Sequence, residues 1–202
     1  MPILRTSPAS PFGRKVRIAA AVAGLSDRIR IEAADTNDAN DALRQQNPLG
    51  KIPTLLLDDG EPLYDSRVIV EYLNEAAATP VLVPPGPGRL AVLRHQALAD
   101  GLLDACILQV YEGRYRPPEL RGEQWLAHQR GKMERALAHL ATHHAVPGTG
   151  VPHIGEIAQA CALGYLDLRF AGAWRTEHPA LVAWLQDFAA RVPAYALTAP
   201  TA

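Results

Sequence analysis

This sequence has few cysteines, no long hydrophobic run and almost no net charge. Each of these features excludes some classes of protein. The two cysteines among 202 residues, Cys106 and Cys161, form no CxxC or metal-ligand pattern. Both stand at apolar helical positions, where buried thiols are expected. No apolar run approaches the roughly 18 residues of a membrane span, and the N-terminus has no signal-peptide core. The net charge of −1 favours neither a nucleic acid nor an anionic membrane as a partner. We therefore expect a cytoplasmic protein.

A short stretch rich in proline and glycine divides the chain into two parts with different patterns. Residues 79–88 contain four of the 17 prolines, which is typical of a semi-rigid linker. Residues 1–78 alternate strand and helix patterns, whereas residues 89–202 show only helical spacing of their apolar residues. The chain has an ordinary globular composition, with 48% apolar and 20% charged residues. We predict an α/β domain followed by an all-helical domain.

The first part has the element order of a thioredoxin-like domain. Alternation of polar and apolar residues or short apolar runs predict strands, and apolar residues at i, i+3, i+4 and i+7 predict helices. The predicted strands cover 2–6, 28–33, 54–57 and 62–64, and the predicted helices cover 11–23, 37–46 and 65–76, the second of these being only weakly helical. The resulting order, βαβαββα, describes a small mixed sheet with helices on both faces.

Residues 47–73 combine several turn and cap signals in close succession. Their sequence is NPLGKIPTLLLDDGEPLYDSRVIVEYL. A proline precedes a short buried strand, and an Asp-Gly pair is a hairpin signal before the return strand. Asp65 and Ser66 then stand where a helix needs a cap.

A second helix start lies at residues 10–17, with the sequence SPFGRKVR. Ser10 directly precedes Pro11, a residue that suits the first position of a helix, so Ser10 is expected to be the N-cap. Taken alone, Ser10 could be a plain cap. The same geometry could also stabilise an anion, because the helix N-terminus offers free N–H groups and the hydroxyl can donate a hydrogen bond.

Together the two stretches resemble the glutathione-binding half of cytosolic glutathione S-transferases. The NPLGKIPTL segment, the hairpin and the Tyr-Asp-Ser helix start fall in the order of that family. SPFGRKVR resembles the serine-bearing start of helix 1 in the theta and zeta classes, and the CPF start of the omega class with serine in place of cysteine. The resemblance covers nearly the whole chain, because an α/β domain followed by helices is the family's architecture. It implies glutathione as co-substrate and no metal.

The resemblance also implies how glutathione is bound. Ser10 would stabilise the thiolate, with Ser7, which lies farther from the helix start, as the second choice. A hydrogen bond to a charged group and a helix terminus would together lower a thiol pKa of about 8.5 by roughly one to three pH units. Half or more of the bound thiol would then be ionised near neutral pH.

The remaining glutathione-binding residues lie in the loop and helix start of residues 47–73. The family keeps Pro53 in the cis form, so that Ile52 offers its N–H and C=O to the cysteinyl unit as an added strand would. Ser66 would bind the γ-glutamyl carboxylate and Asp65 its ammonium, although the two form a good cap in any case. Lys51 could meet the glycyl carboxylate or could be a solvated loop lysine.

A pocket for the electrophile is expected between the two domains. Its candidate residues are Phe12, which also lies beside glutathione, and three residues near the C-terminal end of the first long helix, Tyr111, Arg114 and Tyr115. A plain helix surface is the alternative for those three.

Other features are expected to be structural. The basic residues of the first helix are expected on its solvated face, without the aromatic interleaving of a nucleic-acid site: Arg14, Lys15 and Arg17. Three histidines share a short stretch without a carboxylate or cysteine to complete a metal site: His139, His143 and His144. Residues 153–156, His-Ile-Gly-Glu, lack the Ser or Thr that often caps the buried third helix of the second part, so half of a capping box is expected to be missing.

The implied activity is transfer of glutathione to a small, mostly apolar electrophile, in a homodimer built across helix 65–76 and the first helix of the second part. A glutathione-dependent thiol–disulfide reductase or peroxidase is an alternative, although residue 10 is not a cysteine. A binding or regulatory module that has kept the fold and lost the chemistry is another. The second substrate is beyond the sequence, because function belongs to the site rather than to the fold.

Overall fold

The computed structural model describes residues 1–143, 145 and 150–200. Its four strands form one mixed sheet in the order β2-β1-β3-β4. The strands are β1 (Ile3–Thr6), β2 (Arg30–Ala33), β3 (Thr54–Leu56) and β4 (Pro62–Leu63). β1 runs parallel to β2 and antiparallel to β3, with Leu4 opposite both Ile31 and Leu55. The predicted thioredoxin-like arrangement is confirmed.

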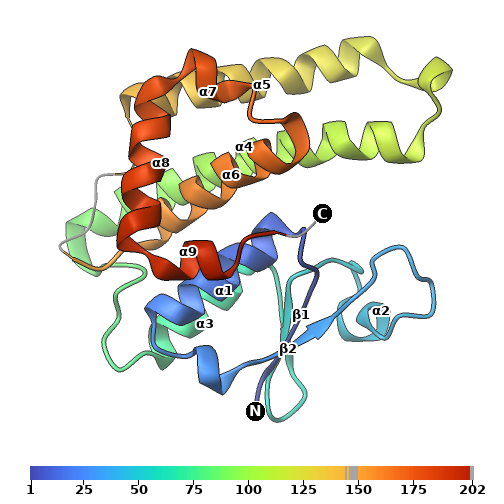
Figure 1. Ribbon diagram of the computed structural model, residues 1–202. Helices are drawn as coiled ribbons and strands as arrows, with labels where there is room; N and C mark the ends of the chain where they lie inside the picture. The colour runs from blue at the N-terminus through green and yellow to red at the C-terminus, as the bar shows by residue number, and fades with distance from the viewer. Residues whose placement is uncertain (144, 146–149, 201–202) are drawn as a thin grey trace.

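Three helices flank this sheet: α1 (Pro11–Val22), α2 (Leu43–Gln46) and α3 (Ser66–Ala76). Figure 1 shows α1 and α3 side by side on one side of the sheet and α2 on the other. The apolar positions that predicted α1 and α3, such as Val16 and Leu73, are fully buried between the helices and the sheet. Their spacing brings one face of each helix onto the strands, so the hydrophobic effect orients both helices.

Two elements start two or more residues later than predicted, because short-range hydrogen bonds compete with regular structure. β2 begins two residues later than expected, after a single 3₁₀ turn, η1 (Ser26–Arg28). The predicted helix 37–46 is confined to α2, because carboxylates accept hydrogen bonds from backbone N–H groups two residues on, as Asp35 does from Asn37 and Asp38 from Asn40. Such local bonds favour turns over helix.

All the regular secondary structure among the described residues of the second part is helical, as predicted. Its helices are η2 (Gly86–Gly88), α4 (Arg89–Tyr115), η3 (Pro118–Leu120), α5 (Glu123–Thr142), α6 (Ile154–Phe170), α7 (Trp174–Glu177), α8 (Pro179–Arg191) and α9 (Pro193–Leu197). α6 lies at the centre, packed against α4 and α1, and every residue from Ile154 to Leu166 is buried. Figure 1 shows α9 crossing over α1, next to the sheet domain.

The N-terminus of α6 corrects one prediction. His153 is its N-cap, and the imidazole Nδ1 accepts a hydrogen bond from the Glu156 N–H at 3.3 Å, while the Glu156 carboxylate accepts from the His153 N–H at 3.1 Å. The capping box is therefore complete. The prediction was wrong because a neutral imidazole nitrogen is an acceptor, as a serine hydroxyl is.

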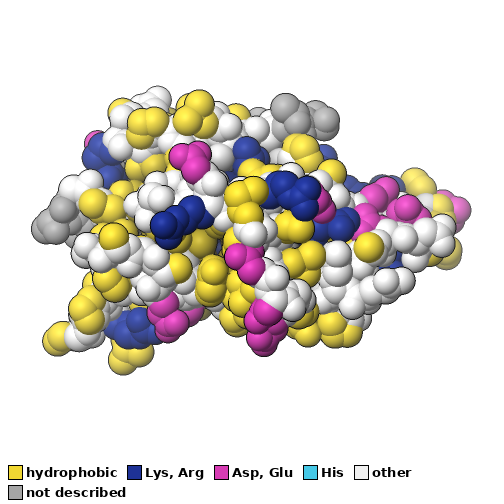
Figure 2. Space-filling model, turned by 90° about the horizontal axis from the view of Figure 1, so that it is seen from below, with side chains coloured by type: hydrophobic (Ala, Val, Ile, Leu, Met, Phe, Trp, Pro, Cys, Tyr) yellow, Lys and Arg dark blue, Asp and Glu magenta, His cyan; other side chains and the backbone are white. Residues whose placement is uncertain are grey.

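Both cysteines are buried and free, as expected, and burial raises the pKa of each thiol to about 12. None of the helices, over the residues that the structure describes, is long and apolar enough to cross a membrane. On the face seen in Figure 2, basic and acidic side chains are interspersed with apolar ones rather than gathered by sign.

Candidate active site at the start of α1

Ser10 caps α1 as the sequence predicts. Its Oγ accepts a hydrogen bond from the Gly13 N–H at 3.0 Å, and the residue is 9% exposed. Because this bond uses a lone pair of the oxygen, the hydroxyl hydrogen remains available for donation. Ser7 lies before the helix, where its carbonyl accepts from the Ser10 N–H at 3.1 Å and closes the preceding turn. The cap and a thiolate donor are therefore compatible roles for Ser10.

A close contact between β1 and α1 holds this helix start in place. A Cβ added to Gly13 would stand 1.9 Å from Thr6 Oγ1 and 3.3 Å from Ser10 Cβ, so only glycine fits at this position. Thr6 is the last residue of β1 and is buried. The first turn of α1 is thus seated directly on the end of the central strand. Sequence reasoning missed this contact, although a glycine in the first turn of a helix was a signal for it.

The loop before β3 is pinned by a side chain that the sequence did not single out. The buried Asn47 side chain donates to the Lys51 carbonyl and to Thr54 Oγ1, both at 3.0 Å. The Ile52–Pro53 peptide bond is cis, as the resemblance implies. Within the described residues, neither the N–H nor the C=O of Ile52 has a hydrogen-bond partner. The loop therefore offers a free donor and acceptor pair.

The start of α3 also has the predicted cap. Asp65 Oδ1 accepts from the Arg67 N–H at 2.9 Å, and Ser66 is buried as the first helical residue. The Tyr64–Asp65 peptide bond is cis as well. Lys51 is exposed on the loop. Burial and the charge of Asp100 raise the pKa of Asp104 on α4, and Lys51 is close enough to oppose that rise.

Beside these elements lies a buried charge cluster that contradicts the expectation of a solvated basic face on α1. Lys15 is fully buried, and its Nζ donates to both carboxylate oxygens of Asp100 on α4, at 2.7 and 2.9 Å. Arg67 Nε donates to the same carboxylate at 3.0 Å, and this bond raises the pKa of Arg67. The cluster joins α1, α3 and α4 directly behind the Ser10 and Ser66 helix starts.

Arg14 is likewise buried rather than solvated. Its guanidinium donates to the Tyr195 carbonyl at 2.6 Å and lies 4.0 Å from the Tyr195 ring centroid, so it joins α1 to α9. Arg17, one turn further along α1, is half-buried. Its pKa is lowered mainly by burial and also by the positive charge of Arg14. The expectation failed because the partners of Arg14 and Lys15 come from distant parts of the chain.

A small cavity is lined in part by Ser10. Besides the helix start, its lining comes from α6, through Cys161 and Tyr165, and from Pro200 after α9. Sequence reasoning missed Tyr165. Burial raises the pKa of the Tyr165 phenol, Arg169 opposes this rise through its charge and a hydrogen bond, and Tyr111 of α4 adds a smaller increase.

The structure brings three of the four predicted electrophile-pocket residues together. Tyr111 and Tyr115 form an edge-to-face pair with centroids 5.4 Å apart, and the Arg114 guanidinium lies 5.5 Å from the Tyr111 centroid. Tyr115 also donates its hydroxyl to Asn37 Oδ1 at 2.6 Å, which links α4 to the loop after β2. Phe12 is on α1, where its ring centroid lies 5.3 Å from Lys15 Nζ.

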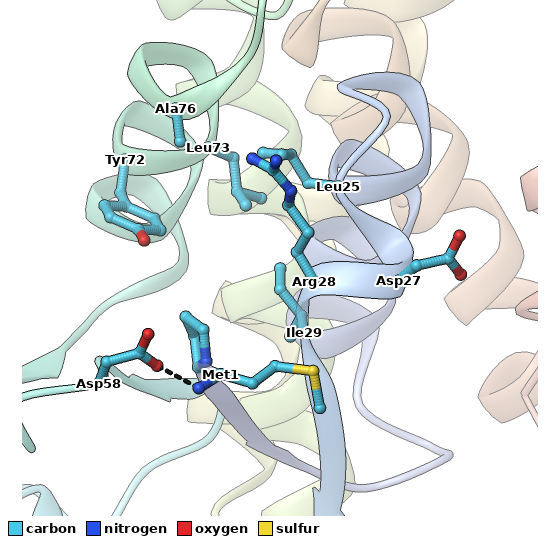
Figure 3. Close-up of a pocket in the computed structure, with 10 residues that line it drawn as sticks. Met1, Leu25, Asp27, Arg28, Ile29, Asp58, Tyr72, Leu73 and Ala76 are labelled. Atoms are coloured by element: carbon cyan, nitrogen blue, oxygen red, sulfur yellow. Dashed lines mark ion pairs between the residues drawn. The ribbon is translucent and has the colours of Figure 1, made fainter.

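Two other regions have features of a site but lie away from Ser10. The His139 and His143 rings stack 4.4 Å apart, His144 lies outside the described residues, and no group of three or more metal-binding side chains occurs among the residues described. A hollow of about 420 Å³ opens where β1 begins, lined by α3 and η1 (Figure 3). There the Met1 amino group meets Asp58 at 2.5 Å. This hollow lies at the opposite end of β1 from Ser10 and is separate from the candidate site.

The fold has a thioredoxin-like sheet and a helical domain around a buried α6. Its site combines a capped α1, a cis-proline loop and a capped α3. These features together are typical of glutathione transferases. The chain belongs to the cytosolic glutathione S-transferase superfamily. Residues 9–76 match the family described as Glutathione S-transferase, N-terminal domain, and residues 123–187 match Glutathione S-transferase, C-terminal domain.

Particular relatives match 95% or more of the chain. Escherichia coli K12 YibF, described as an uncharacterized GST-like protein, is 35% identical over 95% of both chains. A glutathione transferase family member from Pseudomonas fluorescens Pf-5, solved with bound glutathione, is 41% identical over 100% of both chains with a TM-score of 0.89. It has also been solved with S-(propanoic acid)-glutathione. A glutathione S-transferase from Methylobacillus flagellatus, solved with glutathione, is 35% identical over 100% of both chains with a TM-score of 0.91.

Proposed function

We propose that this protein is a serine-type glutathione transferase in which Ser10 stabilises the glutathione thiolate for attack on a small, mostly apolar electrophile. The observation that carries this proposal is the geometry of Ser10. Its oxygen accepts from the Gly13 N–H, which leaves the hydroxyl hydrogen for a sulfur bound at the N-terminus of α1. The N-terminal end of the α1 dipole adds a partial positive charge at the same point, and the Phe12 N–H has no hydrogen-bond partner among the described residues.

The rest of the glutathione molecule would lie along the loop and the start of α3. The N–H and C=O of Ile52, which have no partner among the described residues, would bind the cysteinyl unit as a neighbouring strand would. The buried Ser66 would bind the γ-glutamyl carboxylate and the exposed Asp65 its ammonium. Lys51 would meet the glycyl carboxylate. Glutathione bound in the Pseudomonas and Methylobacillus relatives supports this assignment of the ligand.

The electrophile would enter between the domains, against Phe12 and the cluster of Tyr111, Arg114 and Tyr115. The Pseudomonas relative holds S-(propanoic acid)-glutathione, so its site has room for a substituent on the sulfur. At 40% identity over the whole of both chains, that relative supports a comparable space in this protein.

Two alternatives make different predictions. A reductase that forms a mixed disulfide needs a reactive protein thiol, and burial raises the pKa of both Cys106 and Cys161 to about 12. Such a thiol has almost no thiolate at neutral pH, so only attack by glutathione's own sulfur would remain. A module without catalysis would not need Ser10, Pro53, Asp65 and Ser66 all in place.

We also propose that the protein works in the cytoplasm as a homodimer formed across α3 and α4. Val68 on α3 is 47% exposed and Leu90 on α4 is 77% exposed, although both are apolar. A hollow of about 260 Å³ lies between these helices and could receive a side chain from a second copy. Light scattering after size-exclusion chromatography would measure the mass.

A pH titration of the thiolate absorbance of bound glutathione tests the proposal, with Ser7→Ala as the matched control. In the native protein the bound thiol should titrate well below the free thiol pKa of about 8.5. Ser10→Ala should return the pKa toward that of free glutathione and reduce turnover, while glutathione affinity changes by only a few-fold. A low thiol pKa that survives Ser10→Ala but not Ser7→Ala would move the role to Ser7. Failure to bind glutathione would favour the module without catalysis.

A further inference from the structure

One face of α6 continues the lining of the Ser10 cavity outward. Cys161 and Tyr165 line that cavity together with Ser10, and they stand four residues apart on α6. Arg169 is the next residue at the same spacing. Because residues i and i+4 share a face of a helix, Arg169 lies about 6 Å beyond Tyr165 on the cavity side. Its guanidinium carbon is 6.0 Å from the Tyr165 ring centroid.

The Arg169 guanidinium interacts with the Tyr165 phenol, whose pKa it lowers through its charge and a hydrogen bond, but among the described residues no carboxylate forms an ion pair with it. Its Nε is withdrawn from solvent and has no hydrogen-bond partner within the part of the chain that the structure describes. The acid nearest in sequence, Asp167, is already bound by Arg175 at 2.7 and 2.8 Å and by the Trp174 indole N–H. A buried donor on a charged group is costly to leave unpaired, so this position favours an added acceptor, above all an anion.

On α4, Tyr111 and Arg114 form a second pair of a phenol and a guanidinium, like Tyr165 and Arg169 on α6. Tyr111 faces Tyr165 closely enough to contribute to the raised pKa of Tyr165, of which burial is the larger cause. Arg114 lies 5.5 Å from the Tyr111 centroid. The Tyr165 phenol therefore stands beside Ser10 with Tyr111 close to it, and the guanidinium of Arg169 stands farther out along α6. Planar apolar groups suit the rings, and a carboxylate suits the planar fork of a guanidinium.

We propose that the electrophile carries a carboxylate, that Arg169 binds this carboxylate, and that the reacting carbon then points toward the sulfur held by Ser10. The inference rests on the proposed function and names the substrate class for the same site. With an activated aryl chloride, the thiolate supplies the electron pair of the new S–C bond, the C–Cl bond breaks and chloride leaves with its electrons. The carboxylate is unchanged and serves only to orient the substrate, so Arg169 determines specificity.

Binding of two finished conjugates tests the inference without turnover. S-(2-carboxyethyl)glutathione and S-(2-carbamoylethyl)glutathione differ only in a carboxylate and its neutral amide, and calorimetry would measure both affinities. The native protein should bind the carboxylate conjugate more tightly. Arg169→Met should weaken that conjugate by about 10- to 100-fold and leave the amide conjugate within about threefold, since one charge-assisted interaction is lost. Arg169→Lys should keep part of the preference.

The matched control is Arg28→Met, because Arg28 lies in the separate hollow at the start of β1 (Figure 3). This variant should bind both conjugates as the native protein does. Equal affinity of the native protein for the two conjugates would overturn the inference and leave the proposed function intact. Equal weakening of both conjugates by Arg169→Met would also overturn it, because a structural role alone would then explain Arg169. Binding of neither conjugate, nor of glutathione, would refute the proposed function and the inference with it.

Turnover gives a second readout of the same preference. The aryl chlorides 4-chloro-3-nitrobenzoate and 4-chloro-3-nitrobenzamide form a matched pair, and each enzymatic rate is divided by the uncatalysed rate with glutathione. In Arg169→Met, kcat/KM for the benzoate should fall by about 10- to 100-fold, while that for the benzamide should change little. Loss of both activities together would contradict a role in binding the carboxylate.

Discussion

Replacing Asp100 with asparagine would remove the acceptor that Lys15 and Arg67 share. The carboxylate is 1% exposed and receives two hydrogen bonds from Lys15 Nζ, at 2.7 and 2.9 Å, and one from Arg67 Nε, at 3.0 Å. Asparagine has nearly the same shape, so packing is retained. What changes is that the Lys15 ammonium, which is fully buried, loses its counter-charge.

The expected loss comes mainly from Lys15. Breaking a buried ion pair by removing one partner costs about 3–5 kcal/mol, because the remaining charge is uncompensated. The side chain of Arg67 is 51% exposed and can turn to solvent, so its share should be below about 1 kcal/mol. Asp100→Asn should therefore lower the free energy of unfolding by about 3–5 kcal/mol, a large part of the stability of an ordinary domain.

Urea denaturation at fixed protein concentration would measure this loss, with two further variants as controls. Arg67→Met should change the free energy of unfolding by less than about 1 kcal/mol. The double variant Lys15→Met with Asp100→Leu should recover most of the stability that Asp100→Asn loses, because a buried pair replaced by apolar groups is often neutral. A loss below about 1 kcal/mol in Asp100→Asn would refute the reasoning, since the buried ammonium would then not depend on this carboxylate.

Three further predictions concern the helix starts and the helical domain. Gly13→Ala should displace the start of α1 and lower turnover, and Thr6→Ala added to it should restore much of the activity, because the clash is with Thr6 Oγ1 at 1.9 Å; an unaffected Gly13→Ala enzyme would contradict this contact. Ser66→Ala should weaken glutathione binding by about 10-fold or more, before it affects kcat, and calorimetry showing unchanged affinity would return Ser66 to a structural role. Burial lowers the pKa of His95 in the folded protein. Below about pH 6.5 the unfolded chain therefore binds a proton at His95 more readily than the folded protein does. The free energy of unfolding should accordingly fall as pH falls through that value, less so in His95→Gln, whereas the exposed His128→Gln should behave as the native protein.

The fold was predictable because its signals are local. The turn, cap and strand patterns of residues 47–73 involve partners within a few positions, and the Ser10 cap bonds to Gly13 three residues on. Hydrophobic spacing predicted α1, α3 and the all-helical second part for the same reason. Predictions from local sequence were wrong where a side chain accepts a hydrogen bond that the pattern did not indicate, as His153 does at the start of α6.

The charges around the site could not be predicted in this way. Lys15 and Asp100 are 85 positions apart, and Arg14 meets the Tyr195 carbonyl 181 positions later. Nothing in the sequence near α1 distinguishes these buried cations from solvated ones. Only the packing of α1 against α4, α6 and α9 removes these side chains from water. Once they are buried, the stability of the fold depends on the groups that pair with their charges.

By itself, the sequence determined the family, the order of the elements and the cap at Ser10, because periodicity and capping depend on neighbours along the chain. Tertiary structure alone decided which side chains surround that serine. It placed Tyr165 and Arg169 of α6 beyond Ser10, seated Gly13 on Thr6 and buried Lys15 on Asp100. The physical reason is that burial and partner choice are properties of surfaces brought together by folding, and residues far apart in the sequence form those surfaces.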